Sequence, residues 1–142
     1  MKKTREEIVN ELVEKCLVEL NIASREKYEV EKAERTAAMF LACQMELTSF
    51  IEQVELSAKM GKNEIDRVES DRYFAIKSEN TDKKITEGAM DKYLSKDDAV
   101  REVKKSLAEA EASLKKYNYL FGILTNGFLF FRGMTKRPTN WD

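Results

Sequence analysis

Apolar residues recur at alternating three- and four-residue steps along the last third of the chain. The series runs through Val100, Val103, Leu107, Ala110, Leu114, Tyr117, Phe121, Leu124, Phe128 and Phe131. Such spacing keeps one face of an α-helix against a partner helix. The pattern predicts a long helix that Ser95 caps at its start, with Asp98 three residues later in the first turn. We expect Gly122 and Gly127 to loosen or break this helix near its end, and we do not extend it past Gly133.

A second seam with the same spacing predicts another long helix earlier in the chain. Its members are Ala33, Ala37, Phe40, Cys43, Leu47, Phe50 and Val54. We expect this helix to span about residues 24–60 and to stop at Gly61, since glycine commonly ends a helix. Ahead of it, Thr4 and Glu7 have the spacing of a capping box for a first helix that fades near residues 21–24. The apolar face of that first helix is predicted to hold Ile8, Leu12, Cys16 or Leu17, and Leu20.

The segment between the two seams predicts shorter elements. Asn63 is placed to cap a helix that carries Ile65, Val68, Phe74 and Ile76. A polar loop is expected over residues 78–84, followed by a short helix with Thr86 as its N-cap and Ile85 and Met90 as a hydrophobic staple. No strand pattern persists along the chain. We therefore predict an all-α fold of four or five helices, two of them long, that assemble through helix–helix seams.

The composition argues against several classes of active site. The chain has no histidine, which removes the commonest general base, the histidine-activated nucleophiles and most zinc sites. Its five glycines form no phosphate-binding loop. Asp97 and Asp98 are neighbours that point about 100° apart on a helix, so they fit helix capping better than metal binding. We therefore expect a binding protein and no enzyme, with no catalytic residues, no metal and no cofactor.

The length and the apolar runs bound the organisation of the chain. Its 142 residues predict a single all-helical domain, with residues 1–61 as an N-terminal helical region and residues 135–142 as a tail. Cys16 and Cys43 lie within helical apolar patterns and read as reduced core thiols of a cytoplasmic protein. No run reaches the roughly 18–20 apolar residues of a membrane span, and we expect no membrane partner.

Basic and acidic residues are unevenly distributed along the chain. Residues 112–141 hold five basic residues and no acidic one, which leaves 20 of the 25 basic residues and all 26 acidic residues elsewhere. A chain with a net charge of -1 can therefore still present a local basic surface to nucleic acid. The sequence leaves open whether Lys115 and Lys116 would face DNA or solvent.

Two groups of side chains are candidates for contact with single-stranded nucleic acid. The first combines cations with a flat ring, as binding of phosphates and bases requires, in Arg67, Arg72, Tyr73 and Lys77. The alternative for this group is that Tyr73 is a core residue and the cations are solvated. The second group is Lys83, Lys84, Arg101, Lys104 and Lys105, where interleaved acids favour a solvated face with local ion pairs. Arg101, Lys104 and Lys105 form its best candidate patch for phosphate contacts.

The aromatic residues near the end of the chain predict subunit contacts. Seven aromatic residues follow Leu114, which exceeds what one intramolecular helix face requires. A large exposed apolar face usually marks a partner surface. We assign oligomerisation to Tyr117, Phe121, Leu124, Phe128, Phe130 and Phe131. A membrane-surface role for residues 118–131 is a weaker alternative, because the polar face of this segment lacks lysine and arginine.

Three motifs follow one another in residues 63–134. The first is a helix that carries basic and aromatic residues, Arg67-Val68-Glu69-Ser70-Asp71-Arg72-Tyr73-Phe74. The second is an aspartate pair before the long seamed helix, Leu94-Ser95-Lys96-Asp97-Asp98-Ala99-Val100. The third combines glycine, aromatic, basic and methionine elements, Asn126-Gly127-Phe128-Leu129-Phe130-Phe131-Arg132-Gly133-Met134. In this order of motifs, residues 63–134 resemble the UvsY-like recombination mediators of tailed phages.

The resemblance implies a non-enzymatic mediator of DNA recombination, replication and repair in the cytoplasm of a bacterial host cell. Such mediators form ring-like homo-oligomers, bind single-stranded DNA and help a recombinase to displace single-strand-binding protein. The resemblance places DNA contacts at Arg67, Arg72 and Lys77, and assembly in the terminal aromatic helix. The alternative is a helical protein-interaction module, an adaptor or a phage-encoded inhibitor, that does not bind DNA.

Overall fold

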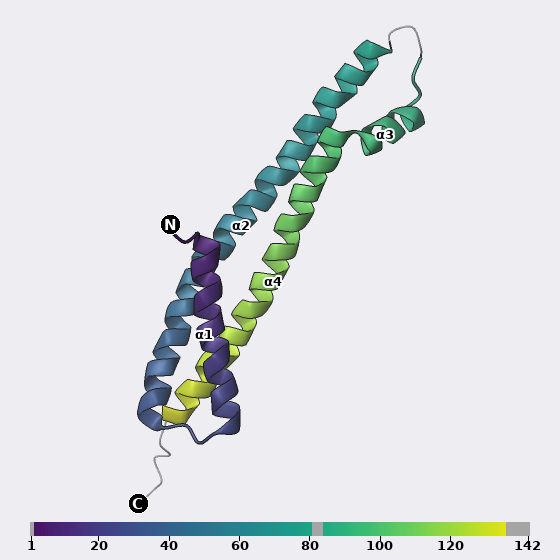
Figure 1. Ribbon diagram of the computed structural model, residues 1–142. Helices are drawn as coiled ribbons and strands as arrows, with labels where there is room; N and C mark the ends of the chain where they lie inside the picture. Colours follow the sequence, from purple (N-terminus) through teal and green to yellow (C-terminus); the bar gives the residue numbers. More distant parts are fainter. Residues whose placement is uncertain (1, 81–83, 136–142) are drawn as a thin grey trace, which may run out of the picture. The chain divides into compact units, whose positions relative to one another are not determined.

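The computed structural model describes residues 2–80 and 84–135, and this part of the chain is built from four α-helices without a strand. In chain order they are α1 (Arg5–Arg25), α2 (Val30–Glu79), α3 (Glu87–Lys96) and α4 (Asp98–Thr135), as traced in Figure 1. Two of the four helices are long: α2 has 50 residues and α4 has 38. The predicted all-α fold with two long helices is therefore confirmed.

The helices form two compact units. Unit 1 comprises Met1–Glu52 and Lys115–Asp142, so it contains α1, the first part of α2 and the last part of α4. Unit 2 comprises Gln53–Leu114 and contains the second part of α2, all of α3 and the first part of α4. This grouping differs from the linear division predicted at residue 61, because packing brings the first and last segments of the chain into one unit.

The core of unit 1 is formed by one face of α1 and by those parts of the two predicted seams that lie before residue 53 and after residue 114. Its fully buried side chains include Val9, Cys16, Phe40, Cys43, Leu47, Tyr117, Leu124 and Phe131. The Phe131 ring lies 5.0 Å from the Tyr28 ring and 5.3 Å from the Phe40 ring, measured between centroids. Tyr117 meets Phe50 edge-on at 4.9 Å. Aromatic pairs in this geometry add about 0.5–1.5 kcal/mol beyond the burial of their area.

Polar groups inside unit 1 are paired with one another. The Tyr117 hydroxyl bonds Glu6 at 3.1 Å and Asn10 at 3.0 Å, so its ring is buried while its oxygen reaches α1. Burial, followed by the hydrogen bond to Glu6, raises the pKa of the Tyr117 phenol above its ordinary value. The Gln44 amide donates to the Thr125 hydroxyl at 2.7 Å and links α2 to α4.

The two cysteines are free thiols buried in unit 1, as predicted for core residues. Cys16 is wholly buried on α1 and Cys43 is 1% exposed on α2. Their mutual hydrogen bond, together with burial, raises the pKa of the Cys16 thiol. A raised pKa keeps a thiol protonated and unreactive at neutral pH.

Several predicted helix boundaries are wrong. The second helix was predicted to stop at Gly61, but α2 continues through Gly61 to Glu79 without a positive φ. The separate helix predicted from Asn63 is therefore part of α2. Likewise α4 continues through Gly122 and Gly127 to Thr135. Packing along a helix outweighs the cost of about 1 kcal/mol that an interior glycine carries.

The predicted face of α1 and the predicted cap of α4 also need correction. The buried residues of α1 are Val9, Val13 and Cys16, while Ile8 is 44% exposed and Leu17 is 37% exposed. The Thr4 cap itself is confirmed, since its hydroxyl accepts from the Glu7 amide.

At the start of α4, the N-cap is Asp97 and not Ser95. The Asp97 carboxylate accepts from the amides of Ala99 and Val100, at 3.0 and 3.2 Å, and the Asp97 residue also ends α3.

Unit 2 has a thinner core than unit 1. Its buried side chains among the described residues are Ala58, Ile76, Met90 and Val100. Ion pairs join its elements: Lys104 on α4 lies 3.2 Å from Glu69 on α2, and Arg72 on α2 lies 2.7 Å from Asp97. These contacts hold the second part of α2 beside the α3–α4 junction, where the candidate site lies.

Candidate nucleic-acid interface

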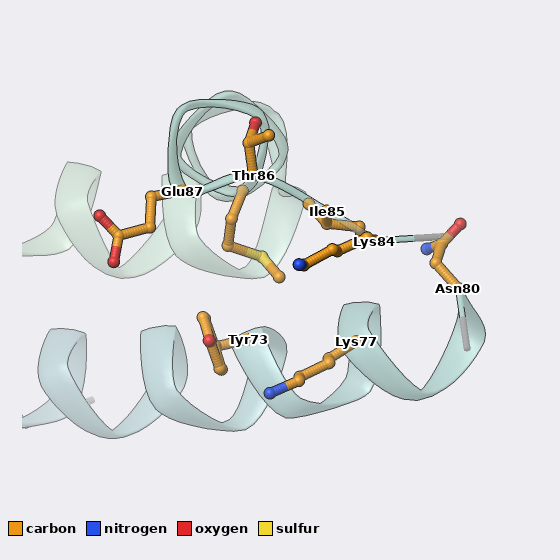
Figure 2. Close-up of a pocket in the computed structure, with 8 residues that line it drawn as sticks. Tyr73, Lys77, Asn80, Lys84, Ile85, Thr86 and Glu87 are labelled. Atoms are coloured by element: carbon orange, nitrogen blue, oxygen red, sulfur yellow. The ribbon is translucent and has the colours of Figure 1, made fainter. Parts of the chain in front are cut away.

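Residues from the end of α2 and from the start of α3 line an open cavity of about 470 Å³ within unit 2. Thr86 begins α3 by accepting a hydrogen bond from the Ala89 amide at 3.2 Å, as predicted for an N-cap. The residues that line the cavity are Tyr73, Lys77, Asn80, Lys84, Ile85, Thr86, Glu87 and Met90. Figure 2 shows Tyr73 and Lys77 on one side of this cavity and Lys84 on the other.

The cavity brings together one aromatic ring and two amino groups, from Tyr73 and Lys77 on α2 and from Lys84 in the segment before α3. Tyr73 is 38% exposed, and the Lys77 amino nitrogen lies 5.8 Å from the centre of its ring. The Phe74 ring lies edge-on to the Tyr73 ring, with 5.5 Å between centroids. Lys84 is exposed and approaches from the segment that leads into α3. A ring for stacking between cations for phosphate is the arrangement that single-stranded nucleic acid requires.

The remaining lining supplies polar and apolar surface. The Asn80 side-chain amide donates to the Ile76 carbonyl at 2.9 Å, which closes the last turn of α2. Met90 is buried and Ile85 is half-buried, so the predicted staple residues both contribute apolar lining. Glu87 adds a carboxylate that would repel a phosphate placed next to it. The favourable positions for a phosphate are therefore next to the Lys77 and Lys84 amino groups and away from Glu87.

Arg72 was predicted to contact DNA, but the structure gives its guanidinium a partner within the chain. The Arg72 Nε donates to the Asp97 carboxylate at 2.7 Å. Burial alone would raise the pKa of Asp97, but the Arg72 bond and the amides of Val100 and Ala99 outweigh burial and lower that pKa. Arg72 thereby positions the cap of α4, and it is less available to a phosphate than the two cavity lysines.

Arg67 is exposed but lies between two carboxylates on its own helix. Its guanidinium bonds Glu64 one turn before it, and Asp71 one turn after it at 3.1 Å. The bond from Arg67 lowers the pKa of the Glu64 carboxyl, and the same bond raises the pKa of Arg67. A phosphate would have to compete with both acids for this cation, so the predicted contact at Arg67 is weakened.

The predicted patch on α4 is divided. Lys104 is paired with Glu69, whereas Arg101 and Lys105 are exposed and have no carboxylate partner among the residues that the structure describes. Lys83 lies outside the described residues. The structure therefore gathers Tyr73, Lys77 and Lys84 at one cavity and leaves Arg101 and Lys105 as separate surface cations.

The predicted oligomerisation residues are mostly used within unit 1. Tyr117, Leu124 and Phe131 are at most 1% exposed, and Phe121 and Phe128 are half-buried. A side chain that is already buried within one chain offers no area to a second, so these three core residues are unavailable for the contact assigned to them. Phe130 remains 46% exposed, and two residues outside the assignment are more so, Leu129 at 57% and Tyr119 at 72%.

The sequence alone did not identify the cavity. Asn80, Ile85 and Glu87 line the cavity but were not assigned to a site, since the sequence predicted only a polar loop over residues 78–84 between the two helices. Scans against protein-family models, curated proteins and solved structures each give no match, so the family resemblance rests on the residues quoted for it.

Among the described residues, none of the helices has the length and apolarity of a membrane span, and no group of acids or thiols is arranged to hold a metal ion.

Proposed function

We propose that this protein is a non-enzymatic phage recombination mediator that binds single-stranded DNA and helps to load a recombinase in place of single-strand-binding protein. The observation that supports this proposal most is the grouping of Tyr73, Lys77 and Lys84 around an open cavity. Tyr73 would stack on one base, and the two lysines would contact the adjoining phosphates. Arg101 and Lys105 would add contacts along the backbone.

Each of these contacts is weak, and the proposal requires assembly to make them sufficient. An exposed lysine neutralises one phosphate without holding it in a fixed geometry. Several chains on one strand raise the local concentration of binding sites, so avidity replaces a single strong site. A mediator of this kind holds DNA firmly enough to compete with single-strand-binding protein and releases it locally to a recombinase.

The binding proposal is tested by fluorescence anisotropy with a labelled single-stranded oligothymidine over a range of salt concentrations. Replacing Lys77 and Lys84 with alanine should make the fall of log affinity with log salt less steep by about 1.4, since each lost phosphate contact on a single strand contributes about 0.7. Tyr73→Ala should weaken binding by about 1–3 kcal/mol, and Tyr73→Phe should retain most of it.

A matched control removes two other exposed lysines from the same unit, Lys59 and Lys62. This double variant loses the same charge but leaves the cavity intact. An equal loss of affinity in the two double variants would show that net charge alone attracts DNA and would contradict a site at the cavity. Absence of salt-sensitive binding by the unaltered protein would remove the DNA-binding proposal altogether.

The loading step is measured separately, with DNA that is first covered by single-strand-binding protein. The unaltered protein should shorten the lag before a recombinase begins to hydrolyse ATP on that DNA. With the Lys77→Ala, Lys84→Ala variant, the lag should be as long as it is without the protein. If the protein binds DNA but does not affect the lag, DNA binding stands and mediation does not.

A helical protein-interaction module is the alternative function. It is favoured by two exposed apolar side chains one turn apart on α2, Leu56 at 59% and Met60 at 62% exposure. Apolar side chains at this spacing can anchor a partner helix. Two results together would support this alternative. The unaltered protein would bind a purified recombinase but not oligothymidine, and the Leu56→Ser, Met60→Ser variant would lose the recombinase.

A further inference from the structure

The exposed side of α4 in unit 1 carries an uncharged stripe. Tyr119, Gly122, Asn126, Leu129 and Gly133 follow one another at steps of three or four residues, and all are exposed. No charged residue occurs between Tyr117 and Phe131. A Cβ atom placed on Gly122 or Gly133 would meet nothing within 4 Å, so the surface is open at both glycines. Four helical turns of exposed surface without a charge are unusual for a protein in which 36% of residues are charged.

Two glycines of this stripe and two exposed aromatic residues, Tyr119 of the stripe and Phe130 beside it, are placed symmetrically about Asn126. Tyr119 lies seven residues before Asn126 and Gly133 lies seven residues after it, while Gly122 lies four before and Phe130 four after. A twofold axis through Asn126 that sets two α4 helices antiparallel therefore places Tyr119 of one copy over Gly133 of the other. The same axis places Phe130 over Gly122. Each large ring then faces an open glycine on the second helix.

We propose that two copies of this chain associate through the stripe, with their α4 helices antiparallel and Asn126 on the twofold axis. Such a contact is isologous, since the same patch serves both copies. The Asn126 amide carries both donors and an acceptor, so two of them on the axis can bond each other reciprocally. Between Tyr117 and Phe131 no charge would lose its hydration and no like charges would meet.

A second copy is the occupant that fits the stripe best. The pairing of large with small residues is symmetric within the one sequence, which a different partner would not require. The inference deepens the assembly part of the proposed function by naming its contact surface. It does not depend on DNA binding, because the cavity residues belong to unit 2 and the stripe belongs to unit 1.

Cysteine cross-linking in the full-length protein tests the geometry. In an antiparallel pair, Asn126→Cys lies on the axis and should form a disulfide-linked dimer under mild oxidation, since facing positions of packed helices come within disulfide range. Tyr119→Cys should not link to itself, because the two substituted positions would be about 21 Å apart along the direction of the helices. A mixture of Tyr119→Cys and Gly133→Cys proteins should yield the mixed dimer. Self-linking at Tyr119→Cys without linking at Asn126→Cys would overturn the antiparallel arrangement.

Mass by light scattering tests the association without a cross-link. The unaltered protein should form dimers or multiples of dimers, and Asn126→Lys should weaken self-association about tenfold or more, because it places two like charges on the axis. The control is Asn21→Lys, an exposed asparagine of the same unit that lies on α1. Circular dichroism confirms that both variants remain helical. Equal weakening by both lysines, or a monomer at about 100 µM chain, where micromolar contacts are populated, would refute the proposal.

Discussion

Gly127 shows how one residue determines the packing of α4 on α2. The sequence suggested that this glycine loosens the helix, but it lies buried on the seam and faces the Phe40 ring. A Cβ atom at this position would overlap Phe40, approaching its Cδ2 to 2.9 Å. Phe40 cannot move aside easily, because it is fully buried and its ring packs on Phe131. The glycine therefore permits a close approach of two helices.

Gly127→Ala should lower the free energy of unfolding by about 1–3 kcal/mol, the usual cost of overpacking a core. Gly122→Ala is the matched control on the same helix, since a methyl group there enters open space. It should raise the free energy of unfolding by up to about 1 kcal/mol through helix propensity. Urea denaturation at a chain concentration low enough to prevent association checks both values, and a stabilising Gly127→Ala would contradict the close approach.

At the scale of elements, Asp97 joins three helices. It ends α3, caps α4 through the amides of Ala99 and Val100, and accepts the Arg72 guanidinium from α2. The sequence identified an aspartate pair in a capping context but assigned the cap to Ser95. The choice between them depends on Arg72, which lies 25 residues away and favours a charged carboxylate at this position.

Asp97→Ala should lower the melting temperature more than Asp98→Ala, because Asp98 is an exposed first-turn acid without these partners. The pKa of Asp97 is lowered in the folded protein, so its stabilisation is complete above the ordinary aspartate pKa of about 3.9. It is lost as the pH falls through the lowered value. Thermal unfolding should therefore separate the two variants at pH 7 and bring Asp97→Ala and the unaltered protein together in acid. A difference that stays constant into acid would exclude the charged form of Asp97 as its cause.

At the scale of the whole molecule, the two units differ in how much apolar surface they bury. Unit 1 contains buried aromatic rings, including Phe40, Tyr117 and Phe131, whereas the largest buried side chains of unit 2 are Ile76 and Met90. Local stability follows buried contacts, so segments with few of them open more often. The unit that holds the candidate DNA site is therefore expected to be the more dynamic one.

Hydrogen exchange measured by mass spectrometry should show faster exchange in peptides from residues 53–79 and 98–114 than in peptides from residues 33–51 and 117–131. The difference follows from the smaller buried core of unit 2. Saturating oligothymidine should slow exchange around residues 73–90, because a bound strand stabilises the folded form of its site.

Thiol labelling gives a second measure of opening. Cys16 and Cys43, buried in unit 1, should react with a maleimide only when that unit opens. Equal exchange in both units would contradict the expected order of stability.

Much of the fold could be predicted because helical periodicity is a local property. The residues of both long seams, the Thr4 cap and the Thr86 cap are where the spacing placed them. Helix ends were predicted less well at Gly61 and Gly127, since glycine propensity amounts to about 1 kcal/mol and packing outweighs it. The candidate site was predicted in part, since Tyr73, Lys77 and Lys84 line the cavity. The acids that pair with Arg67 lie one turn away on its own helix, so its spacing in the sequence already indicated them, whereas the partner of Arg72 lies 25 residues away.

The amino-acid sequence alone established that this protein is helical and which residues form the seams, and it showed that the chain has no histidine. These properties depend only on the local spacing of residues and on composition. The packing of the helices determines that Arg72 and Lys104 are paired, which terminal residues are buried, and which face of α4 is left uncharged and exposed. Those outcomes depend on contacts between segments far apart in the chain, and the free energy of such contacts exceeds the local preferences that the sequence displays.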